Sequence, residues 1–169
     1  MKLGQDFFNR DVLEVAPDLL GKVLVRRFDN GKLFTSQITE VEAYRGEEDK
    51  ACHASKGRTS RTEIMYHPGG SVYIYLIYGM HWMLNFVTGG RDEPQAVLIR
   101  GLDLISGPGR ITRRLEIGPD FYGESLAGSE RLWIENSDQQ LAMKTSPRIG
   151  IEYAGEPWKT LPWRYVANR

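Results

Sequence analysis

The sequence has little material for disulfides or metal sites. Its 169 residues include one cysteine, Cys52, and three histidines. A single cysteine cannot form a disulfide within the chain, and no second cysteine stands at metal-ligand spacing from it. His53, His67 and His81 are far apart in the sequence and form no recognised ligand pair. We therefore expect a reducing compartment, no bound metal ion and no cofactor.

Long apolar runs are also absent. The longest ones are interrupted by glycine, histidine or charged residues well before they reach the length of a membrane span. The first 20 residues contain acidic side chains and lack the continuous apolar region of a secretory signal. These observations predict a cytoplasmic protein without a membrane segment.

The chain has no excess of charge of either sign. It contains 22 Lys plus Arg and 22 Asp plus Glu, so it lacks the overall basicity typical of a nonspecific nucleic-acid binder. Positive charge is instead clustered in three acid-free stretches, which hold Lys56, Arg58 and Arg61, then Arg110, Arg113 and Arg114, and finally Lys159, Arg164 and Arg169. Each cluster taken alone is compatible with ordinary solvated surface. Three of them favour a polarised surface.

The pattern along the chain predicts a single α+β domain over residues 1–169, with a curved, mainly antiparallel sheet and a protruding β-hairpin. Residues 11–20 have helical spacing, and residues 22–28 and 33–44 are expected to be two strands joined at Asn30-Gly31. Residues 45–65 are expected to form a long loop. Further strands are expected in the two arms of residues 71–90, on either side of a turn at 78–81, and at 96–104. A basic helix is expected at 109–115, and a last strand around 148–153.

Two carboxylates and a phenol share one face of the expected strand 33–44. Strand alternation places Glu40, Glu42 and Tyr44 on the same side. On a solvated face these side chains would be unremarkable surface residues. In a cleft, a carboxylate beside an aromatic ring can activate water or stabilise positive charge on a sugar. The sequence leaves both readings open.

The expected hairpin at 71–90 has an unusual turn. Turns are normally polar, but this one reads Tyr78-Gly79-Met80-His81 and is followed by Trp82. An apolar tip either packs against the rest of the domain or serves as a binding surface. One known use of such a tip is a wedge that unstacks DNA bases.

Several strings, in this order, resemble the alkyladenine (3-methyladenine) DNA glycosylase family. They are EVEAY, EEDKACHASKGRTSR, PGGSVYIYLIYGMHWMLNF, AVLIRGLDL, SGPGR and RIGIEYAGE. The matching segments extend from FFNRDVLEVAPDLLGKVLVR to PWRYV and cover nearly the whole chain. The resemblance is to the compact bacterial-type members. It implies an enzyme of DNA base-excision repair that acts on damaged purines.

The resemblance also implies the catalytic residues. Glu42 matches the carboxylate that orients and deprotonates the attacking water. Arg100 and the main-chain carbonyl of Ile149 match further contacts of that water. No lysine nucleophile is apparent beside Glu42, which argues against a lyase that forms a Schiff base. A monofunctional DNA N-glycosylase is therefore expected.

The remaining roles concern substrate binding. Tyr44 matches the aromatic residue on one face of the flipped base, and His53 and Tyr75 match those on the other face. Asn85 matches a residue that excludes normal guanine by crowding its exocyclic amino group.

The residues expected to intercalate into DNA follow from the same resemblance. Tyr78 matches the side chain that fills the gap left in the duplex, with Met80 beside it. Of the basic clusters, Lys56, Arg58, Arg61 and Arg110 are expected to contact the DNA backbone. The expected partner is double-stranded DNA carrying a damaged purine, bound by a monomer.

Two other functions remain compatible with these residues. A damage sensor would keep the wedge and the pocket without turnover, although the presence of Glu42 and Arg100 weighs against it. A carbohydrate hydrolase would also use carboxylates and aromatic rings, but the basic clusters oppose that reading.

Overall fold

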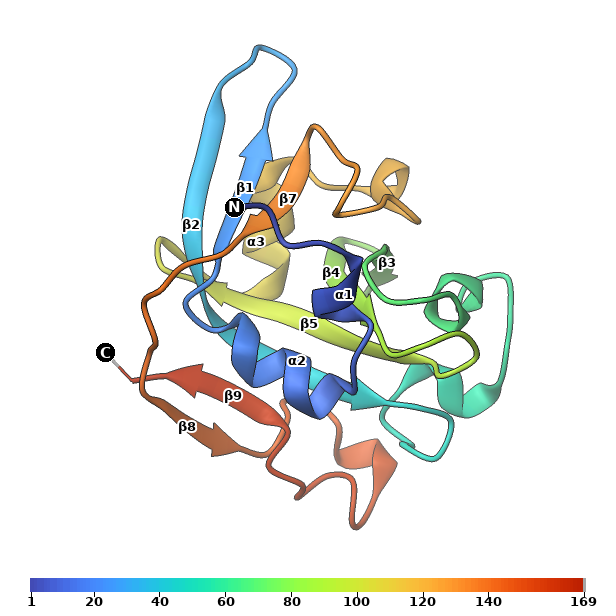
Figure 1. Ribbon diagram of the computed structural model, residues 1–169. Coiled ribbons are helices and arrows are strands. Elements are labelled where there is room, and N and C mark those ends of the chain that lie inside the picture. The colour runs from blue at the N-terminus through green and yellow to red at the C-terminus, as the bar shows by residue number, and fades with distance from the viewer. Residues whose placement is uncertain (169) are drawn as a thin grey trace.

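The chain folds around a curved sheet, shown in a computed structural model that describes residues 1–168 (Figure 1). Arg169, the last residue of the third basic cluster, lies outside the described residues. All strand pairings within residues 1–168 are antiparallel. The main path of the sheet is β3 (Val72–Ile77), β4 (His81–Thr88), β5 (Gln95–Leu102), β2 (Leu33–Arg45), β1 (Val23–Arg27) and β7 (Leu132–Glu135). Off this path, β6 (Ile105–Ser106) pairs with β5, and β9 (Arg164–Ala167) pairs with β2 and with β8 (Met143–Ser146).

The sheet changes partners along its longest strand, β2. The first part of β2 pairs with β1, and the second part pairs with β5 and β9. Within the second part, the pairing with β5 contains two register shifts, one on each side of Glu40. Its partner there is Gly101, where an added Cβ would lie 2.9 Å from the Cβ of Glu40. Such irregularities bend a strand and redirect its side chains, which curves the sheet at this point.

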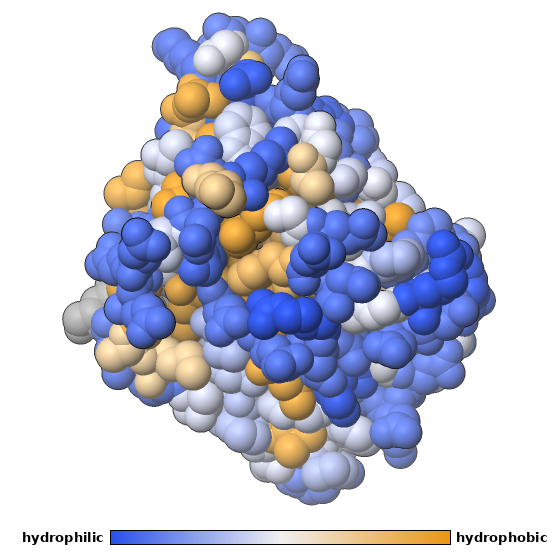
Figure 2. Space-filling model, viewed as in Figure 1, coloured by the Kyte–Doolittle hydropathy of each residue, from blue (hydrophilic) through white to orange (hydrophobic). Residues whose placement is uncertain are grey.

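Two helices enclose the core. Asp11 caps α2 (Val12–Leu19) by accepting a hydrogen bond from the main-chain N–H of Leu13. This helix packs on β2 and β5, whereas α3 (Pro108–Leu115) packs on β4 and β5. Both bury apolar residues in the same cluster as the sheet. The outer face around α1 (Gln5–Phe8) and α2 is largely hydrophilic, with small apolar areas in the middle of the view (Figure 2).

Most elements agree with the sequence analysis. The α+β class, the antiparallel sheet, both hairpins and the helices near 11–20 and 109–115 are confirmed. The loop after β2 contains two short 3-10 turns, η1 (His53–Lys56) and η2 (Glu63–Tyr66). Further 3-10 turns are η3 (Pro119–Phe121) and η4 (Glu152–Ala154). Within residues 1–168, no helix is both long and apolar enough to cross a bilayer.

The strand expected around 148–153 is wrong. Residues 149–150 form a turn with Gly150 at a φ of 73°, and η4 follows. The strand lies earlier, at β8, and ends before Pro147, which has no N–H to continue the ladder. The sequence analysis also missed β7, whose short run of four residues lies in a polar stretch.

A buried ion pair holds this turn in place. Arg148 and Asp49 have fully buried side chains, and Arg148 NH1 lies 2.6 Å from Asp49 Oδ2. The same guanidinium donates to the carbonyl oxygens of Ala43, at 2.9 Å, and Trp158, at 3.3 Å. Asp49 in turn accepts from the main-chain N–H of Ala51, at 3.0 Å. Strand β2, the loop after it and the C-terminal segment are therefore joined through one pair of charges.

Replacing Arg148 with methionine is expected to lower the free energy of unfolding by about 3 to 5 kcal/mol, because Asp49 is then buried without its partner. Urea denaturation followed by circular dichroism measures this loss. Arg10→Met is a suitable control, since Arg10 pairs with Asp18 on the surface and should cost about 1 kcal/mol or less. Equal losses in the two variants would contradict a special role for the buried pair.

Candidate functional site

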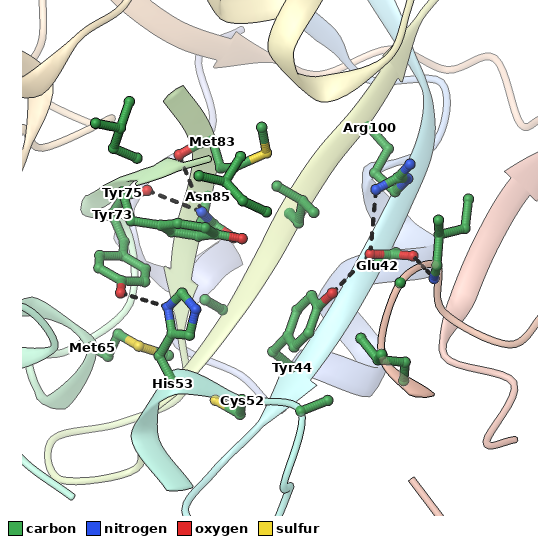
Figure 3. Close-up of a pocket in the computed structure, with 18 of the residues that line it drawn as sticks. Glu42, Tyr44, Cys52, His53, Met65, Tyr73, Tyr75, Met83, Asn85 and Arg100 are labelled. Atoms are coloured by element: carbon green, nitrogen blue, oxygen red, sulfur yellow. Dashed lines mark hydrogen bonds and ion pairs between the residues drawn. The ribbon is translucent and has the colours of Figure 1, made fainter. Parts of the chain in front are cut away.

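A cavity of about 290 Å³ lies between strands β2 and β5 on one side and the hairpin β3-β4 on the other. Figure 3 shows Glu42, Tyr44 and Arg100 on one wall, facing His53, Tyr75 and Asn85 across the space. Loop residues 51–53, 61 and 65 and the C-terminal residues 149–151 and 153 also line it. The volume is near the lower end of the range for small-molecule sites, which suits a single planar ring system.

Glu42 is fully buried and its carboxylate is held at three points (Figure 3). The hydroxyl of Tyr44 donates to Oε1 at 2.8 Å, and the main-chain N–H of Ile149 donates to Oε2 at 2.6 Å. Arg100 NH1 lies 3.7 Å from Oε1. These contacts fix the orientation of the carboxylate toward the cavity.

The pKa of Glu42 reflects two opposing effects. Burial raises it above its ordinary value, while Arg100, the Ile149 N–H, the Tyr44 hydroxyl and Arg148 oppose that rise. The pKa of Tyr44 is raised well above its usual value by burial and by the Glu42 charge. Tyr44 is therefore a hydrogen-bond donor at neutral pH. The surroundings of Glu42 set its strength as a base.

Arg100 reaches two carboxylates from an irregular position in β5. The register shifts at Glu40 leave Arg100 without a direct partner in β2. Its Nε donates to Glu40 Oε2 at 3.2 Å. The side chains expected to share one face of β2 therefore do so, but Glu40 does not line the cavity, whereas Glu42 and Tyr44 do.

The opposite wall is aromatic. The rings of His53 and Tyr75 meet edge to face, with centroids 4.4 Å apart. His53 Nδ1 is 2.8 Å from the hydroxyl of Tyr73. Burial, together with the charges of Arg61 and Lys56, lowers the pKa of His53 to about 4. His53 is therefore neutral at physiological pH and adds no positive charge to this wall.

Asn85 is buried at the upper end of the cavity (Figure 3). Its Nδ2 donates to the carbonyl oxygens of Tyr73, at 3.2 Å, and Met83, at 3.3 Å. The side chain thus fixes the backbone of the hairpin and also lines the cavity.

The hairpin tip projects away from the rest of the chain. Tyr78 is 86% exposed and Met80 is 68% exposed, so the tip does not pack against the domain. Tyr78 has a φ of 53°, a left-handed conformation that is unfavourable for a bulky residue. Because Ile77 pairs with His81, the turn contains only three residues. It presents two large apolar side chains beside the mouth of the cavity, where Tyr78 also lines the wall.

The four basic residues expected to contact DNA differ in their surroundings. Arg58 pairs with Glu63, at 2.7 Å, and with Asp92, at 3.1 Å. Arg61 lies over the ring of Tyr75, with the guanidinium carbon 5.3 Å from the centroid.

The other two basic residues, Lys56 and Arg110, are exposed. The first turn of α3, which carries Arg110, packs closely on His81. A Cβ added at Gly109 in this turn would lie 3.1 Å from the His81 ring. Arg58 is thus held by two carboxylates, and the phosphate contacts of all four residues stay a prediction.

Sequence reasoning missed several residues of this site. Asp49 and Arg148, which hold the two loops together, are 99 positions apart, and nothing in their local sequence marks them as partners. Tyr73 and Tyr153 line the cavity as well. The alternation of residues 72–77 is the one local signal that could have found Tyr73, because it places Tyr73 and Tyr75 on the same face of β3. Among residues 1–168, no group of three His, Cys, Asp or Glu side chains is placed to bind a metal ion.

Comparisons with known proteins identify the family of this chain. A family profile described as Methylpurine-DNA glycosylase (MPG) matches residues 6–169. A relative from Desulfitobacterium hafniense (strain Y51) is 41% identical over 192 aligned positions, covering 97% of this chain and 94% of that protein. Another, from Anaeromyxobacter dehalogenans (strain 2CP-C), is 43% identical and covers 98% of this chain and 83% of that protein. Both carry the name "Putative 3-methyladenine DNA glycosylase". With a family match over nearly its whole length, the chain belongs to the methylpurine-DNA glycosylase family.

Proposed function

We propose that this protein flips alkylated purines, of the 3-methyladenine type, out of duplex DNA and hydrolyses their bond to deoxyribose. The observation that carries the proposal is the fully buried Glu42 carboxylate, which faces an aromatic wall across a cavity large enough for one base. Family membership supplies the reaction class. The residues of the cavity supply the mechanism.

The flipped base lies between Tyr44 and the wall formed by His53 and Tyr75. Alkylation at a ring nitrogen gives the purine a positive charge, and electron-rich aromatic faces attract cations. A neutral His53 supports this attraction, because an imidazolium in the same wall would repel the base. Flipping is least costly for bases whose pairing is already weakened, which adds selectivity.

Hydrolysis uses Glu42 as the general base. A water molecule beside Glu42 transfers a proton to the carboxylate as its oxygen bonds to C1′ of the deoxyribose, and the N-glycosidic bond breaks. The purine leaves with the bonding electron pair, so an alkylated cationic base leaves as a neutral molecule. The negative charge of Glu42 also stabilises the oxocarbenium character of the sugar. Arg100 and the main chain at Ile149 hold Glu42 in position and stand beside the site of this water.

Several features support a monofunctional hydrolase acting on DNA. No lysine among residues 1–168 lines the cavity, so no amine is placed to form a Schiff base there. The exposed tip residues Tyr78 and Met80 fill the space that the flipped nucleotide vacates. Lys56, Arg61 and Arg110 surround this region and contact phosphates. The functional unit is a single chain with one damaged duplex.

Glu42→Gln is expected to bind lesion-containing DNA nearly as well as the unmodified protein, while excision falls by roughly 10²-fold to 10⁴-fold, because the amide keeps the shape and loses the base. Single-turnover release of the free base, with binding measured separately, tests this. Glu124→Gln removes a carboxylate that pairs with Arg131 outside the cavity and serves as the control. Near-normal excision by Glu42→Gln would remove Glu42 from the mechanism. Binding without any turnover in the unmodified protein would indicate a damage sensor.

Tyr78→Ser is expected to reduce the population of flipped base more than it reduces the initial binding of DNA, because the duplex can then close the gap. A fluorescent base analogue at the lesion reports flipping directly. Leu104→Ser is the matched control, since Leu104 is also a highly exposed apolar residue in a turn, between β5 and β6. An unchanged flipping amplitude in a folded Tyr78 variant would assign the tip another role.

Asn85→Ser is expected to raise excision of guanine-type bases relative to adenine lesions, because the shorter side chain leaves room for the exocyclic amino group of guanine. The same change removes two hydrogen bonds to the hairpin backbone, so some loss of stability accompanies it. The ratio of rates on two duplexes, one with each type of base, separates the effects. A uniform loss, with no change in that ratio, would restrict Asn85 to a structural role.

A further inference from the structure

Glu40, the second carboxylate that Arg100 contacts, belongs to a row of alternating charges that ends at Glu42. Arg164 Nε lies 2.8 Å from Glu40 Oε2, and Arg100 Nε lies 3.2 Å from the same oxygen. Arg100 NH1 then lies 3.7 Å from Glu42 Oε1. The order of charges is therefore Arg164, Glu40, Arg100, Glu42. Only the last of these has a completely buried side chain.

The distances show that Arg100 is shared unequally. Its shorter contact is with Glu40, which is partly exposed, and its longer contact is with the buried Glu42. An arginine with one carboxylate partner tends to form two parallel hydrogen bonds with it. Arg100 makes no such pair with Glu42, whose oxygens are instead occupied by the Tyr44 hydroxyl and the Ile149 N–H.

The backbone builds this arrangement. The two register shifts between β2 and β5 fall on either side of Glu40. Gly101 permits the close approach, because a Cβ at this position would lie 2.9 Å from the Cβ of Glu40 and 3.2 Å from Thr39 Oγ1. Arg164 is fixed on β9 by its contact with Ser146 Oγ, at 2.9 Å. Irregular pairing next to a site is a common way to aim a side chain.

We propose that Glu40 is a positioning residue, which holds Arg100 at its distance from Glu42 and so keeps Glu42 a stronger base than direct pairing with Arg100 would leave it. The inference rests on the proposed function in that Glu42 is taken to deprotonate the water. Glu40 itself does not line the cavity and touches no reacting atom.

The groups that face Glu42 come from several elements. Tyr44 is on its own strand, Arg100 is on β5, Tyr75 is on β3, and Arg148, Ile149 and Tyr153 are on the segment around η4. Arg100 opposes the rise in the pKa of Glu42 more than any other of these groups does. A residue that controls the position of Arg100 therefore affects the pKa of Glu42.

The direction of the effect follows from the signs of the charges. Glu40→Gln removes a negative charge near Glu42 and frees Arg100 to approach it, and both changes favour the ionised carboxylate, so the pKa of Glu42 falls. Arg164→Gln leaves Glu40 with Arg100 as its one arginine partner and draws Arg100 away, so the pKa of Glu42 rises. The two variants thus move the same pKa in opposite directions, which loss of stability alone would not do.

The experiment measures single-turnover excision of a methylated purine as a function of pH. Ionised Glu42 is the active form, so the rate rises with pH through its pKa. In Glu40→Gln this rise is expected about one pH unit lower, with a lower plateau because a weaker base accepts the proton less readily. In Arg164→Gln the rise is expected at higher pH. The control Glu124→Gln removes a carboxylate of similar exposure from its arginine and should leave the profile unchanged.

A second readout does not depend on activity. Carbon-13 NMR of labelled glutamate carboxyl groups follows the titration of Glu42, with Glu42→Gln identifying its signal. Opposite shifts in the two variants support the proposal. Equal shifts, or none in either variant, overturn it, even if the protein excises methylated purines. If the unmodified protein has no excision activity, the proposed function fails, while the titration still decides whether Glu40 controls Glu42.

Discussion

The buried ion pair between Asp49 and Arg148 is the constraint on which the site depends. It joins the loop that carries His53 to the turn that carries Ile149. Arg148 also lies over the ring of Tyr44, 4.9 Å from its centroid. Two walls of the cavity and the donor to Glu42 are therefore fixed by one interaction. Buried charges without partners are strongly unfavourable, so the loops have little freedom to separate.

The buried carboxylate of Glu42 also needs compensation for its charge. A fully buried carboxylate is unstable unless other groups compensate for its lost hydration. For Glu42, the Tyr44 hydroxyl, the main-chain N–H of Ile149 and the Arg100 guanidinium at 3.7 Å share that compensation. Each holds Glu42 without fully neutralising it as a base. In the aromatic wall opposite, burial and the nearby charges of Arg61 and Lys56 lower the pKa of His53 to about 4, so its imidazole adds no positive charge of its own.

The hairpin combines order and strain. Strand β4 is fixed by its pairing with β5, and the hydrogen bond from Asn85 to the Tyr73 carbonyl ties it to β3, whereas the turn holds Tyr78 in a left-handed conformation. Strained backbone persists where the surrounding structure over-determines it, and it is often found at functional sites. A rigid base and a short turn present the two apolar side chains of the tip in a fixed position. An apolar surface of this kind is suited to contact stacked bases.

The sequence by itself determined the elements whose signals are local. Alternation in β2 put Glu42 and Tyr44 on one face, and Asn30-Gly31 and the Tyr78 turn located both hairpins. The family resemblance assigned the roles. Only the tertiary structure decided that Glu42 is buried rather than solvated, and that residues 149–150 form a turn. It also decided which charges pair. Arg148 and Asp49 are 99 positions apart and Arg164 and Glu40 are 124 positions apart, so these contacts leave no periodic signal in the chain.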